Sequence, residues 1–574
     1  MKYQLVNENF KESYVNSLLK ARGVNNIYNF LNPTEDCLNS YEDLDNIKEA
    51  AILLVSKLKE GNKILIIVDS DVDGFTSAAI TYLYLQKVAP MVEIEYWLHE
   101  GKQHGLEDHI EKLLDQNDYD LLIIPDASSN DYKYHEMLKN IDLPVLVLDH
   151  HLVDEQISDN AVIINNQTSP SYKNKDLTGA GVVFQFCRYL DWVFGVDYAK
   201  NFIDLAALGI VADMASMLSL ENRYIIKTGF NRIRNFFFNV LVEKQSFSMG
   251  GKVTPITVAF YVVPLINAMI RVGSIEEKTR LFEAFIDGEK TVLSNKRGAK
   301  GEPEFLAVES ARECTNAKTK QNNLKEKITE ILESKIYKKG LLDNEILFIK
   351  LDEEDDIFPQ ELTGLIAMQL SARFKKPTIV ARVTDDGHVK GSMRGVNGSE
   401  LESFKDFLED SDFFEYVSGH DNAAGISIYE ESLFNFHKYA NEKLKDIDFG
   451  QNYHEINFSR YAVDEDLYSL VLEIGLADEL WGQNNSTPKI LVQGINLNQN
   501  EYQIIGKNKD TVKFTKNGVD YIHFRAKDMI EKFEEFENLT LEIIGEAKIN
   551  EWGGRTKPQV IIKDYSINDG NLSF

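Results

Sequence analysis

The chain has 574 residues, 43% of them hydrophobic and 27% charged, which is enough for about three or four domains with sizeable cores. A formal net charge of −29 argues against indiscriminate binding to polyanions, so any nucleic-acid site must be local and focused. Three widely spaced cysteines, Cys37, Cys187 and Cys314, exclude a disulfide framework and a zinc site made of paired thiolates. Apolar runs shorter than the ~20 residues of a membrane span, and an N-terminus without a signal pattern, predict a cytoplasmic protein with no membrane partner.

Residues 1–60 are expected to form accessory helices, and from Lys63 apolar strands alternate with helices. The strands are expected at 64–68, 92–98, 121–125, 145–149 and 161–165. This alternation predicts an α/β domain, residues 61–274, whose parallel sheet is covered on both faces. Because ligands of such sheets bind beyond the carboxyl ends of the strands, the residues that follow each strand are candidates for a binding site.

Acidic and imidazole side chains follow three of these strands, and a later helix at 202–217 supplies one more acid. They are Asp69, Asp71 and Asp73, then Asp126, then Asp149, His150 and His151, and finally Asp213. In an extended segment alternate side chains share a face, so the first three carboxylates are expected to point the same way and to repel unless a cation neutralises them. A solvated Asp-rich turn is the alternative for that segment alone. Four segments at one rim favour a metal site, and carboxylates with a neutral imidazole suit one or two Mn²⁺ or Mg²⁺ ions.

In order and spacing, these segments resemble the four signature motifs of the DHH phosphoesterase superfamily. The matching segments are DSDVDG (69–74), PDAS (125–128), DHH (149–151) and VADM (211–214). LTGAGVVFQF (177–186) and VVPLINAMIRVG (262–273) are similar to segments of the RecJ-type single-stranded-DNA exonucleases within that superfamily. The resemblance covers roughly residues 60–270 and 345–570. It implies a metal-dependent enzyme that degrades single-stranded DNA from 5′ to 3′ into mononucleotides, in DNA recombination and repair.

The resemblance also implies roles for individual residues. It implies two ions held by Asp69, Asp71, Asp73, Asp126, His150 and Asp213. Asp149 would orient a neighbouring histidine, and His151 would contact the scissile phosphate or assist proton transfer. Arg271 takes a substrate-facing role.

Beyond this domain, residues 275–344 read as a connector with helices at 276–285 and 304–338, and residues 345–450 as a smaller α/β, DHH-associated domain. The latter is expected to contain a helix at 359–374, strands at 377–383 and 388–396, and a turn at 392–394. By resemblance it would hold the DNA strand or its terminal phosphate. The residues implied are Arg373, Ser392, Arg394, Gly419 and His420.

Three departures from the family pattern stand out. Ser418 precedes Gly419 and His420 where the family usually has Gly-Gly-His, and Ser216 replaces a usual proline. The segment HEGKQHG (99–105) stands where an arginine-containing segment often follows the second strand. Lys102 and His104 are the candidate substitutes for that arginine.

The last portion, residues 451–574, is expected to form an OB-like β-barrel of five or six short strands around one helix at 527–536. Basic side chains there interleave with aromatic ones, as backbone neutralisation and base stacking require, although barrel-core aromatics give the same pattern. The residues are Lys507, Lys509, Lys513, Lys516 and Arg525 with Tyr502, Phe514, Tyr521 and Phe524.

Two alternatives to the exonuclease hypothesis remain open. One is a DHH phosphoesterase that cleaves oligoribonucleotides or cyclic dinucleotides, against which the C-terminal barrel argues. The other is a catalytically inactive DHH-type scaffold in a replication complex, against which the retained motif acids argue. The expected partner is single-stranded DNA, with a single-stranded-DNA-binding protein or a helicase as candidate recruiting partners.

Overall fold

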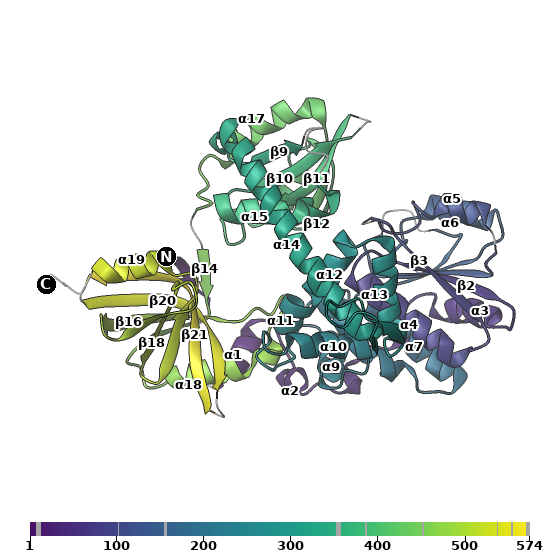
Figure 1. Cartoon of the computed structure of the whole chain (residues 1–574), viewed down its shortest axis with the longest axis horizontal. Helices are drawn as coiled ribbons and strands as arrows, with labels where there is room; N and C mark the ends of the chain where they lie inside the picture. The colour runs from purple at the N-terminus through teal and green to yellow at the C-terminus, as the bar shows by residue number, and fades with distance from the viewer. Residues whose placement is uncertain are drawn as a thin grey trace. The chain divides into compact units, whose positions relative to one another are not determined.

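The computed structural model describes residues 1–6, 13–101, 103–116, 118–153, 158–351, 358–384, 387–450, 453–535, 538–552 and 555–569. Two compact units are present (Figure 1). The first unit comprises Val24–Gln321 with Glu479–Ser486. The second unit comprises Met1–Gly23, Asn322–Asp478 and Thr487–Phe574.

The first unit is built on a five-stranded parallel sheet, as predicted. The strands are β2 (Lys63–Val68), β3 (Glu93–Leu98), β4 (Leu121–Pro125), β5 (Val145–Asp149) and β6 (Val162–Asn165). Their order in the sheet is β3-β2-β4-β5-β6, and every neighbouring pair is parallel. All five carboxyl ends therefore meet at one edge of the sheet, where ligands of such folds bind.

Helices cover both faces of this sheet because its strands are apolar on both sides (Figure 1). Along β2, Ile64 and Ile66 pack into the core beneath α3 (Ile47–Lys57), α4 (Val72–Val88) and α7 (Gly179–Phe194). Leu65 and Ile67 point the other way, toward α5 (Ile110–Asp115) and α6 (Tyr132–Lys139). Alternate side chains of β2 thus pack into the hydrophobic cores on opposite faces of the sheet.

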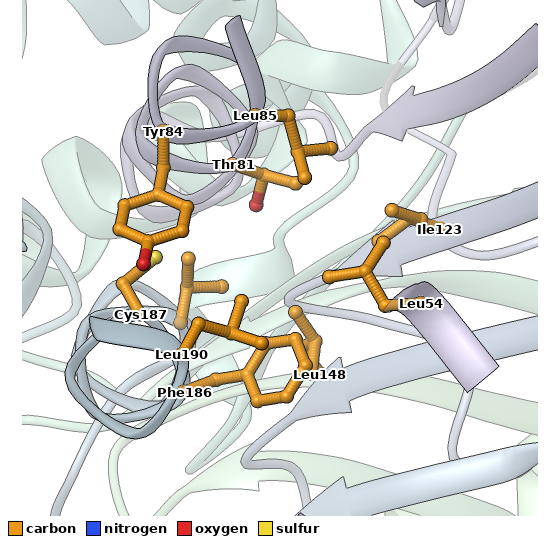
Figure 2. Close-up of a pocket in the computed structure, with 10 residues that line it drawn as sticks. Leu54, Thr81, Tyr84, Leu85, Ile123, Leu148, Phe186, Cys187 and Leu190 are labelled. Atoms are coloured by element: carbon orange, nitrogen blue, oxygen red, sulfur yellow. The ribbon is translucent and has the colours of Figure 1, made fainter. Parts of the chain in front are cut away.

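An apolar cavity lies between α3, α4, α7 and the sheet (Figure 2). Leu54, Leu148 and Phe186 contribute to its walls, together with Tyr84 and the thiol of Cys187. Tyr84 donates its hydroxyl hydrogen to Asp191 at 2.9 Å, and burial raises the pKa of Cys187 well above its usual value. With a protonated thiol and hydrocarbon walls, this cavity offers nothing to a metal or a phosphate and is a gap in core packing.

Helices make up the rest of the first unit, apart from one small hairpin. In chain order its further elements are α2 (Ile27–Leu31), η1 (Glu35–Cys37), η2 (Tyr41–Asp43), η3 (Ala199–Phe202), α8 (Ile203–Ala212), α9 (Leu220–Asn231), α10 (Phe236–Gln245), α13 (Ile275–Asp287), β7 (Thr291–Leu293) and β8 (Pro303–Phe305). The long α14 (Leu306–Lys338) contributes residues to both units. The connector helices were predicted correctly, but the hairpin was not. It ends at Phe305, so α14 begins two residues later than expected.

One described helical stretch, Pro255–Val272, is long and apolar enough to cross a membrane by length and composition. It is made of α11 (Pro255–Thr257), the π-helical η4 (Val258–Val262) and α12 (Val263–Val272). Pro264 does not interrupt it, because proline is tolerated in the first turn of α12. Half of the stretch is buried, and Val258 and Ile266 belong to the core of the first unit. Since core helices pass the same test, this is weak evidence for a membrane span.

The second unit contains a five-stranded mixed sheet in the order β12-β13-β11-β10-β9. Its elements are η5 (Leu341–Asp343), β9 (Leu347–Leu351), η7 (Gln360–Leu362), α15 (Thr363–Phe374), β10 (Thr378–Val383), β11 (His388–Arg394), α16 (Phe404–Glu409), β12 (Phe414–His420), β13 (Ala423–Tyr429), η8 (Glu430–Ser432) and α17 (Leu433–Leu444). The predicted turn at residues 392–394 is wrong. These residues lie in β11, where β10 and β13 both pair with them and keep the backbone extended.

A seven-stranded sheet in the order β15-β16-β20-β21-β19-β18-β17 forms the C-terminal part. Its elements are β15 (Phe458–Tyr461), α18 (Leu467–Leu476), η9 (Asp478–Leu480), β16 (Lys489–Asn498), β17 (Tyr502–Ile505), β18 (Thr511–Lys516), β19 (Val519–His523), α19 (Lys527–Glu535), β20 (Asn538–Trp552) and β21 (Arg555–Asp569). The predicted strands are present, but α18 was missed and packs against β20 and β21. Apolar residues on one helix face, such as Leu470 and Ile474, bury it there.

The first 60 residues are not purely helical, contrary to the prediction. They begin with β1 (Lys2–Leu5), which pairs in parallel with β14 (Tyr453–Ile456), and α1 (Tyr14–Ala21) follows. The backbone N–H of Val15 donates to Glu473 at 2.9 Å. The N-terminus therefore belongs to the second unit, because its hydrogen-bonding partners lie in the C-terminal half of the chain.

Candidate metal centre

Carboxylates and imidazoles converge at the carboxyl edge of the parallel sheet. Three groups of side chains each have potential ligand atoms within 4.8 Å of one another. The groups are Asp69 with Asp71 and Asp126, Asp73 with His150 and Asp213, and Asp126 with His150 and His151. Because the groups share Asp126 and His150, they form one continuous cluster. The structure thus brings together all six predicted metal ligands.

The junction of β2 and α4 positions the first three acids, but not in the way expected. The strand ends at Val68, and Asp71 is the N-cap of α4, where its carboxylate accepts a hydrogen bond from the Gly74 N–H at 2.9 Å. Asp73 lies in the first helical turn. The three side chains therefore do not alternate along an extended strand. An N-cap aspartate satisfies a free N–H of the first helical turn, which favours helix over strand at this point.

Asp73 is held by the N-terminus of α7. Its carboxylate accepts hydrogen bonds from the N–H groups of Gly179 and Ala180, at 2.8 and 3.1 Å, and from the Thr178 hydroxyl at 3.1 Å. The positive end of a helix dipole stabilises an anion in this position. Only glycine fits at residue 209, because a Cβ there would lie 2.2 Å from Asp73 Oδ1.

Asp126, Asp213 and His150 close the cluster. Asp126 adopts a left-handed backbone conformation, with φ of 70°, directly after β4. Asp213 is the C-cap residue of α8. The Nε2 atom of His150 lies 3.2 Å from Asp126 Oδ1, 3.8 Å from Asp213 Oδ2 and 3.9 Å from Asp73 Oδ2. The imidazole therefore faces three carboxylates at once.

These side chains are buried or half-buried without enough positive charge to balance them. Burial and neighbouring carboxylates raise the pKa of Asp73 to about 7 and that of Asp213 to about 8, and they raise the pKa of Asp126 well above its usual value. Burial and the neighbouring His151 lower the pKa of His150 to about 4, which leaves its imidazole neutral. The buried Oδ1 atoms of Asp69 and Asp126 accept no hydrogen bond from any described residue. A bound cation would fit this set of oxygen donors and neutral nitrogen.

Asp149 and His151 form a pair beside the cluster. Asp149 is buried and accepts hydrogen bonds from His151 Nδ1 at 2.8 Å and from the Ser129 N–H at 3.0 Å. Although burial works against ionisation, the bond and charge of His151 hold the pKa of Asp149 well below its usual range. The same pairing outweighs burial for His151 and raises its pKa to about 10. His151 is therefore a half-exposed cation of fixed orientation.

A cavity of about 120 Å³ opens beside the cluster. Asp71, Asp73 and Asp213 line one part of it, and Asn267 and Arg271 of α12 line another. Burial lowers the pKa of Arg271, whereas the nearby Asp71 raises it. The substrate-facing role of Arg271 stays a prediction, and its side chain lines this cavity. Asn267 was not predicted, although its spacing of four residues from Arg271 places both on one helix face.

The segment after β3 also reaches the cluster. His104 Nδ1 lies 2.6 Å from Asp69 Oδ2, so this histidine bonds a candidate ligand. Lys102, the other candidate substitute for the family arginine, lies outside the described residues. A substrate-binding role for His104 stays a prediction, and the structure places this side chain in contact with Asp69.

In the second unit, four of the five predicted substrate residues gather on the sheet. Ser392 and Arg394 lie in β11, and Gly419 and His420 lie in β12. Both Arg394 and His420 pair with Ala423 of the intervening β13. Ser392 Oγ lies 3.0 Å from the Thr363 hydroxyl, and Arg394 donates to the Met393 carbonyl at 2.6 Å.

Arg373, the fifth predicted substrate residue of the second unit, lies away from the other four. It forms an ion pair with Glu333 of α14 at 2.5 Å. It lies at the opposite end of α15 from Thr363, about 15 Å along the helix axis at 1.5 Å per residue. Its role in binding substrate stays a prediction.

The aromatic residues of the C-terminal sheet divide into two groups. Phe514 and Tyr521 are buried and stacked on each other, with ring centroids 4.9 Å apart, so they are core residues and not base-stacking platforms. Phe524 is 57% exposed and precedes the exposed Arg525. Lys513 and Lys516 form ion pairs with Asp520 and Glu501. The alternation of basic and aromatic residues in the sequence therefore includes both core and surface positions.

Family models match both ends of this architecture. Residues 63–210 match the DHH family, N-terminal domain, and residues 464–564 match the RecJ OB domain. The first match spans the parallel sheet and every candidate ligand except Asp213. The fold and its carboxylate–histidine cluster thus define a protein of the DHH class.

Relatives extend this assignment to the whole chain. Over 576 residues it is 34% identical to the putative SPbeta prophage-derived single-strand DNA-specific exonuclease YorK of Bacillus subtilis (strain 168), covering 99% of this chain and 98% of the relative. It is 26% identical over 542 residues to the single-stranded-DNA-specific exonuclease RecJ of the same bacterium, covering 92% of this chain and 64% of that protein. The chain belongs to the RecJ-type single-strand-DNA-specific exonuclease family.

A solved structure supports the fold independently. The crystal structure of RecJ in complex with Mn²⁺ from Thermus thermophilus matches with a TM-score of 0.74 and 19% sequence identity. The match covers 98% of this chain and 79% of that one. It confirms the predicted fold class, including the parallel-sheet domain, the smaller α/β domain and the C-terminal OB-like domain.

Proposed function

We propose that this chain is a metal-dependent exonuclease that hydrolyses single-stranded DNA from 5′ to 3′ into mononucleotides, in DNA recombination and repair. The observation that carries the proposal is the cluster of five buried or half-buried carboxylates and one neutral imidazole beside a cavity that also contains Arg271. It occurs in a chain that matches a named single-strand DNA-specific exonuclease over 98% of that relative's length.

The residues that would hold two Mn²⁺ or Mg²⁺ ions share hard oxygen or neutral nitrogen donors. They are Asp69, Asp71, Asp73, Asp126, His150 and Asp213. Bound divalent ions activate water and stabilise negative charge on a phosphate and its leaving oxygen. The Oδ1 atoms of Asp69 and Asp126, which accept no hydrogen bond from the described residues, and the raised pKa values of Asp73 and Asp213 support this assignment.

His151 would bind the scissile phosphate and supply a proton to the leaving oxygen. Its raised pKa keeps it protonated at neutral pH, and half of its side chain is exposed to an incoming ligand. Asp149 acts as a positioning residue, because it fixes the ring through Nδ1 and leaves Nε2 for the substrate. In this arrangement His151 transfers the proton, and it is not one of the six residues that would hold the ions.

Arg271 and Asn267 would hold the phosphate of the strand in the cavity. A guanidinium binds phosphate through two parallel hydrogen bonds, and the amide of Asn267 adds another donor on the same helix face. We further propose that Ser392, Arg394, Gly419 and His420 bind the strand or its terminal phosphate, with Arg373 in a supporting position. The domain limits 61–274, 275–344, 345–450 and 451–574 are proposed on the same basis.

Two other functions are less well supported. A DHH phosphoesterase for oligoribonucleotides or cyclic dinucleotides would not need the C-terminal domain that matches the RecJ OB domain. A catalytically inactive scaffold would not need the complete set of acids. A DNA substrate also implies a cytoplasmic enzyme, and we propose that a single-stranded-DNA-binding protein or a helicase delivers that substrate.

The test is a degradation assay with Mn²⁺ and three substrates: labelled single-stranded DNA, single-stranded RNA and a cyclic dinucleotide. We expect rapid loss of DNA, and a 5′ label should leave as a mononucleotide before a 3′ label does. The Asp126→Ala, Asp213→Ala double variant should lose at least ~10³-fold in rate, because it removes two ligands from the shared cluster.

Asp115→Ala is the matched control, since it removes an exposed carboxylate at the end of α5. It should leave the rate unchanged. Equal activity of the double variant would refute the metal centre. Preferential cleavage of the cyclic dinucleotide would favour the first alternative, and no cleavage of any substrate would favour the scaffold.

A further inference from the structure

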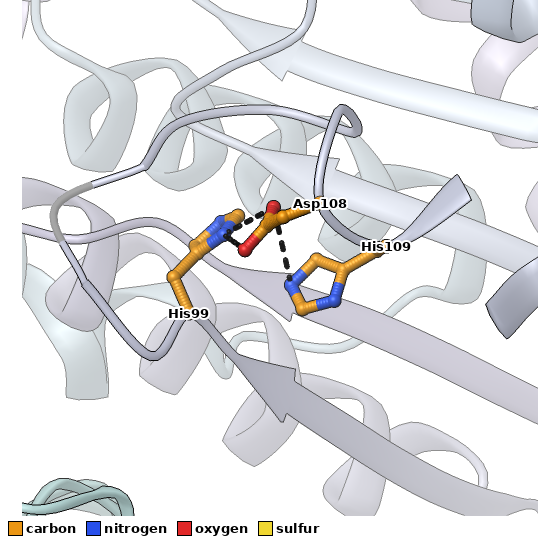
Figure 3. Close-up of side chains that lie close together, drawn as sticks. All are labelled: His99, Asp108 and His109. Atoms are coloured by element: carbon orange, nitrogen blue, oxygen red, sulfur yellow. Dashed lines mark hydrogen bonds and ion pairs between the residues drawn. The ribbon is translucent and has the colours of Figure 1, made fainter. Parts of the chain in front are cut away.

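A second group of metal-binding side chains lies between β3 and α5, outside the centre described above (Figure 3). His99 follows β3 directly, and Asp108 and His109 precede the first turn of α5. Asp108 lies between the two rings: His99 Nδ1 is 2.8 Å from its Oδ1, and His109 Nε2 is 4.0 Å from the same atom. The potential ligand atoms all lie within 4.8 Å of one another.

Both imidazoles of this group are buried with incomplete hydrogen bonding. His99 is 1% exposed and His109 is 8% exposed. The Nε2 atoms of both rings have no hydrogen-bond partner among the described residues. In His109 this is the nitrogen directed at Asp108, as Figure 3 shows. Buried polar atoms normally have partners, so this nitrogen is available for one that the protein does not supply.

We propose that His99, Asp108 and His109 bind a divalent transition-metal ion of the zinc type, at a site separate from the catalytic centre. Two imidazoles and one carboxylate are a usual zinc ligand set, and two nitrogen donors disfavour Mg²⁺. Ligand atoms ~2.0–2.2 Å from zinc lie roughly 3.4 Å apart in a tetrahedron. Two of the ligand pairs lie 2.8 and 4.0 Å apart and the two imidazole atoms lie within 4.8 Å, so the side chains must shift by about 1 Å to complete the site. Metal binding would also replace the hydrogen bond between His99 Nδ1 and Asp108, with the proton leaving Nδ1.

The surroundings favour metal binding over a simple hydrogen-bonded pair. Burial and the neighbouring His99 lower the pKa of His109 to about 4, so its nitrogen lone pair is available at neutral pH. Although burial works against ionisation, the His99 hydrogen bond holds the pKa of Asp108 below its usual value, which keeps the carboxylate charged. The Asp108 side chain is 27% exposed, so water can reach the fourth coordination position.

The position of this site gives it a structural consequence. The bound ion would join the two ends of the segment between His99 and His109. That segment carries His104, which contacts Asp69 of the catalytic centre. Lys278 also binds it, through the carbonyls of His99 and Gly101 at 3.3 and 3.2 Å. A zinc-type ion would therefore brace the wall of the catalytic centre without taking part in the reaction.

The experiment measures metal content and not activity. The full chain carrying Asp126→Asn and Asp213→Asn, which weakens the catalytic centre, is stripped with a chelator and titrated with Zn²⁺ by calorimetry. We expect one equivalent bound, and the same equivalent should be found by mass spectrometry after desalting. Adding Asp108→Asn should weaken zinc binding at least tenfold. Glu107→Gln, the same chemical change at the adjacent exposed residue, should have no effect.

His109→Gln is the second variant and should also release the zinc. Asn at 108 keeps the volume of Asp and can still accept the His99 hydrogen bond, so unchanged thermal melting will confirm that the fold is retained. Co²⁺ in the same background should give the visible absorption of a tetrahedral nitrogen–oxygen site, and this absorption should vanish in both variants. Failure to bind zinc in the background protein, or full zinc binding in both variants, would overturn the proposal.

Discussion

Two buried carboxylates show how differently the two units treat the same charge. Asp73 in the first unit and Asp520 in the C-terminal sheet are 1% and 2% exposed. Burial raises the pKa of both, but hydrogen bonds from Lys557 and Thr515 reverse the effect for Asp520 and lower its pKa. Burial and Asp71 instead raise the pKa of Asp73 to about 7.

The difference teaches which acids are structural and which await a ligand. The C-terminal sheet supplies its own counter-ions, because Lys513 and Lys557 both form ion pairs with Asp520. Around Asp73 the metal centre has backbone N–H groups and the neutral imidazole of His150, and no lysine or arginine among the described residues forms an ion pair with this carboxylate. A buried carboxylate without a protein counter-ion is therefore a better sign of a metal site than an acidic motif alone.

Among the single substitutions, the largest effect is expected where the centre is most crowded. Gly209→Ala would place a Cβ 2.2 Å from Asp73 Oδ1 and must displace that carboxylate. A misplacement of this size should lower the exonuclease rate by about 100-fold, measured as kcat/KM on single-stranded DNA. Gly195→Ala is the control, because its φ of 67° makes it strained while no atom lies within 4 Å of the new Cβ. A fully active Gly209→Ala variant would show that Asp73 does not need its present position.

The next effect concerns His151 and depends on pH. Asp149→Asn keeps the shape of the side chain but removes the charge that holds the pKa of His151 at about 10. His151 should then lose its proton near its ordinary pKa of ~6.5, so the rate at pH 8 should fall about 10- to 100-fold and recover toward pH 6. A pH–rate profile checks this. A uniform loss at all pH values would indicate a structural role for Asp149 only.

Stability should respond to pH with opposite signs in the two regions once metal is removed. The raised pKa of Asp213, about 8, means that the metal-free protein loses stability as pH rises from ~4, the ordinary aspartate value, toward 8. Asp213→Asn should therefore melt a few degrees higher than the parent chain in EDTA at pH 8, and equally at pH 4 or below.

Asp520→Asn is the counterpart. The lowered pKa of Asp520 contributes stability above the unfolded value of ~3.9, and this contribution disappears as pH falls through the folded pKa. The variant should thus melt below the parent chain at pH 8 and approach it in acid. Thermal unfolding, monitored by circular dichroism, gives the melting temperatures of both variants. The same sign for both variants would contradict the distinction drawn between the two carboxylates.

The smallest effect is expected on the surface of the C-terminal sheet. Lys507, Lys509 and Arg525 are exposed and form no ion pair among the described residues. Changing all three to Gln should weaken binding of single-stranded DNA a few-fold and reduce the salt slope by up to ~2, at ~0.7 per phosphate contact. Lys516→Gln, which removes a cation already paired with Glu501, should change the slope less. Fluorescence anisotropy of labelled single-stranded DNA, over a range of salt concentrations, gives the affinity and the salt slope of each variant.

The sequence predicted those features that depend on short segments. The five strands of the parallel sheet and the six candidate ligands were found because apolar runs end in acids at equivalent positions. The extended conformation predicted for Asp71 was wrong, because the sequence does not show whether an aspartate that follows a strand continues it or caps the next helix. Phe514 and Tyr521 were ambiguous for a related reason, since burial depends on which strands pair.

Contacts between distant segments could not be predicted from local patterns. The pairing of β1 with β14, the packing of α18 on β20 and the ion pair between Arg373 and Glu333 all depend on the tertiary fold. His99, Asp108 and His109 were missed as a group although they span only eleven positions. Their spacing matches no familiar metal motif, and only the return of the chain at α5 brings them together.

The pairing of β1 with β14 has a consequence for biosynthesis. The backbone of Val15 donates to Glu473, a partner 458 positions farther along the chain, and β1 precedes it. On the ribosome the first strand is made early and must wait for most of the protein before its partner exists. A truncated chain would leave β1 as an unpaired strand, open to pairing with another molecule. The two-stranded β1–β14 sheet can therefore form only after residues 453–456 have been made.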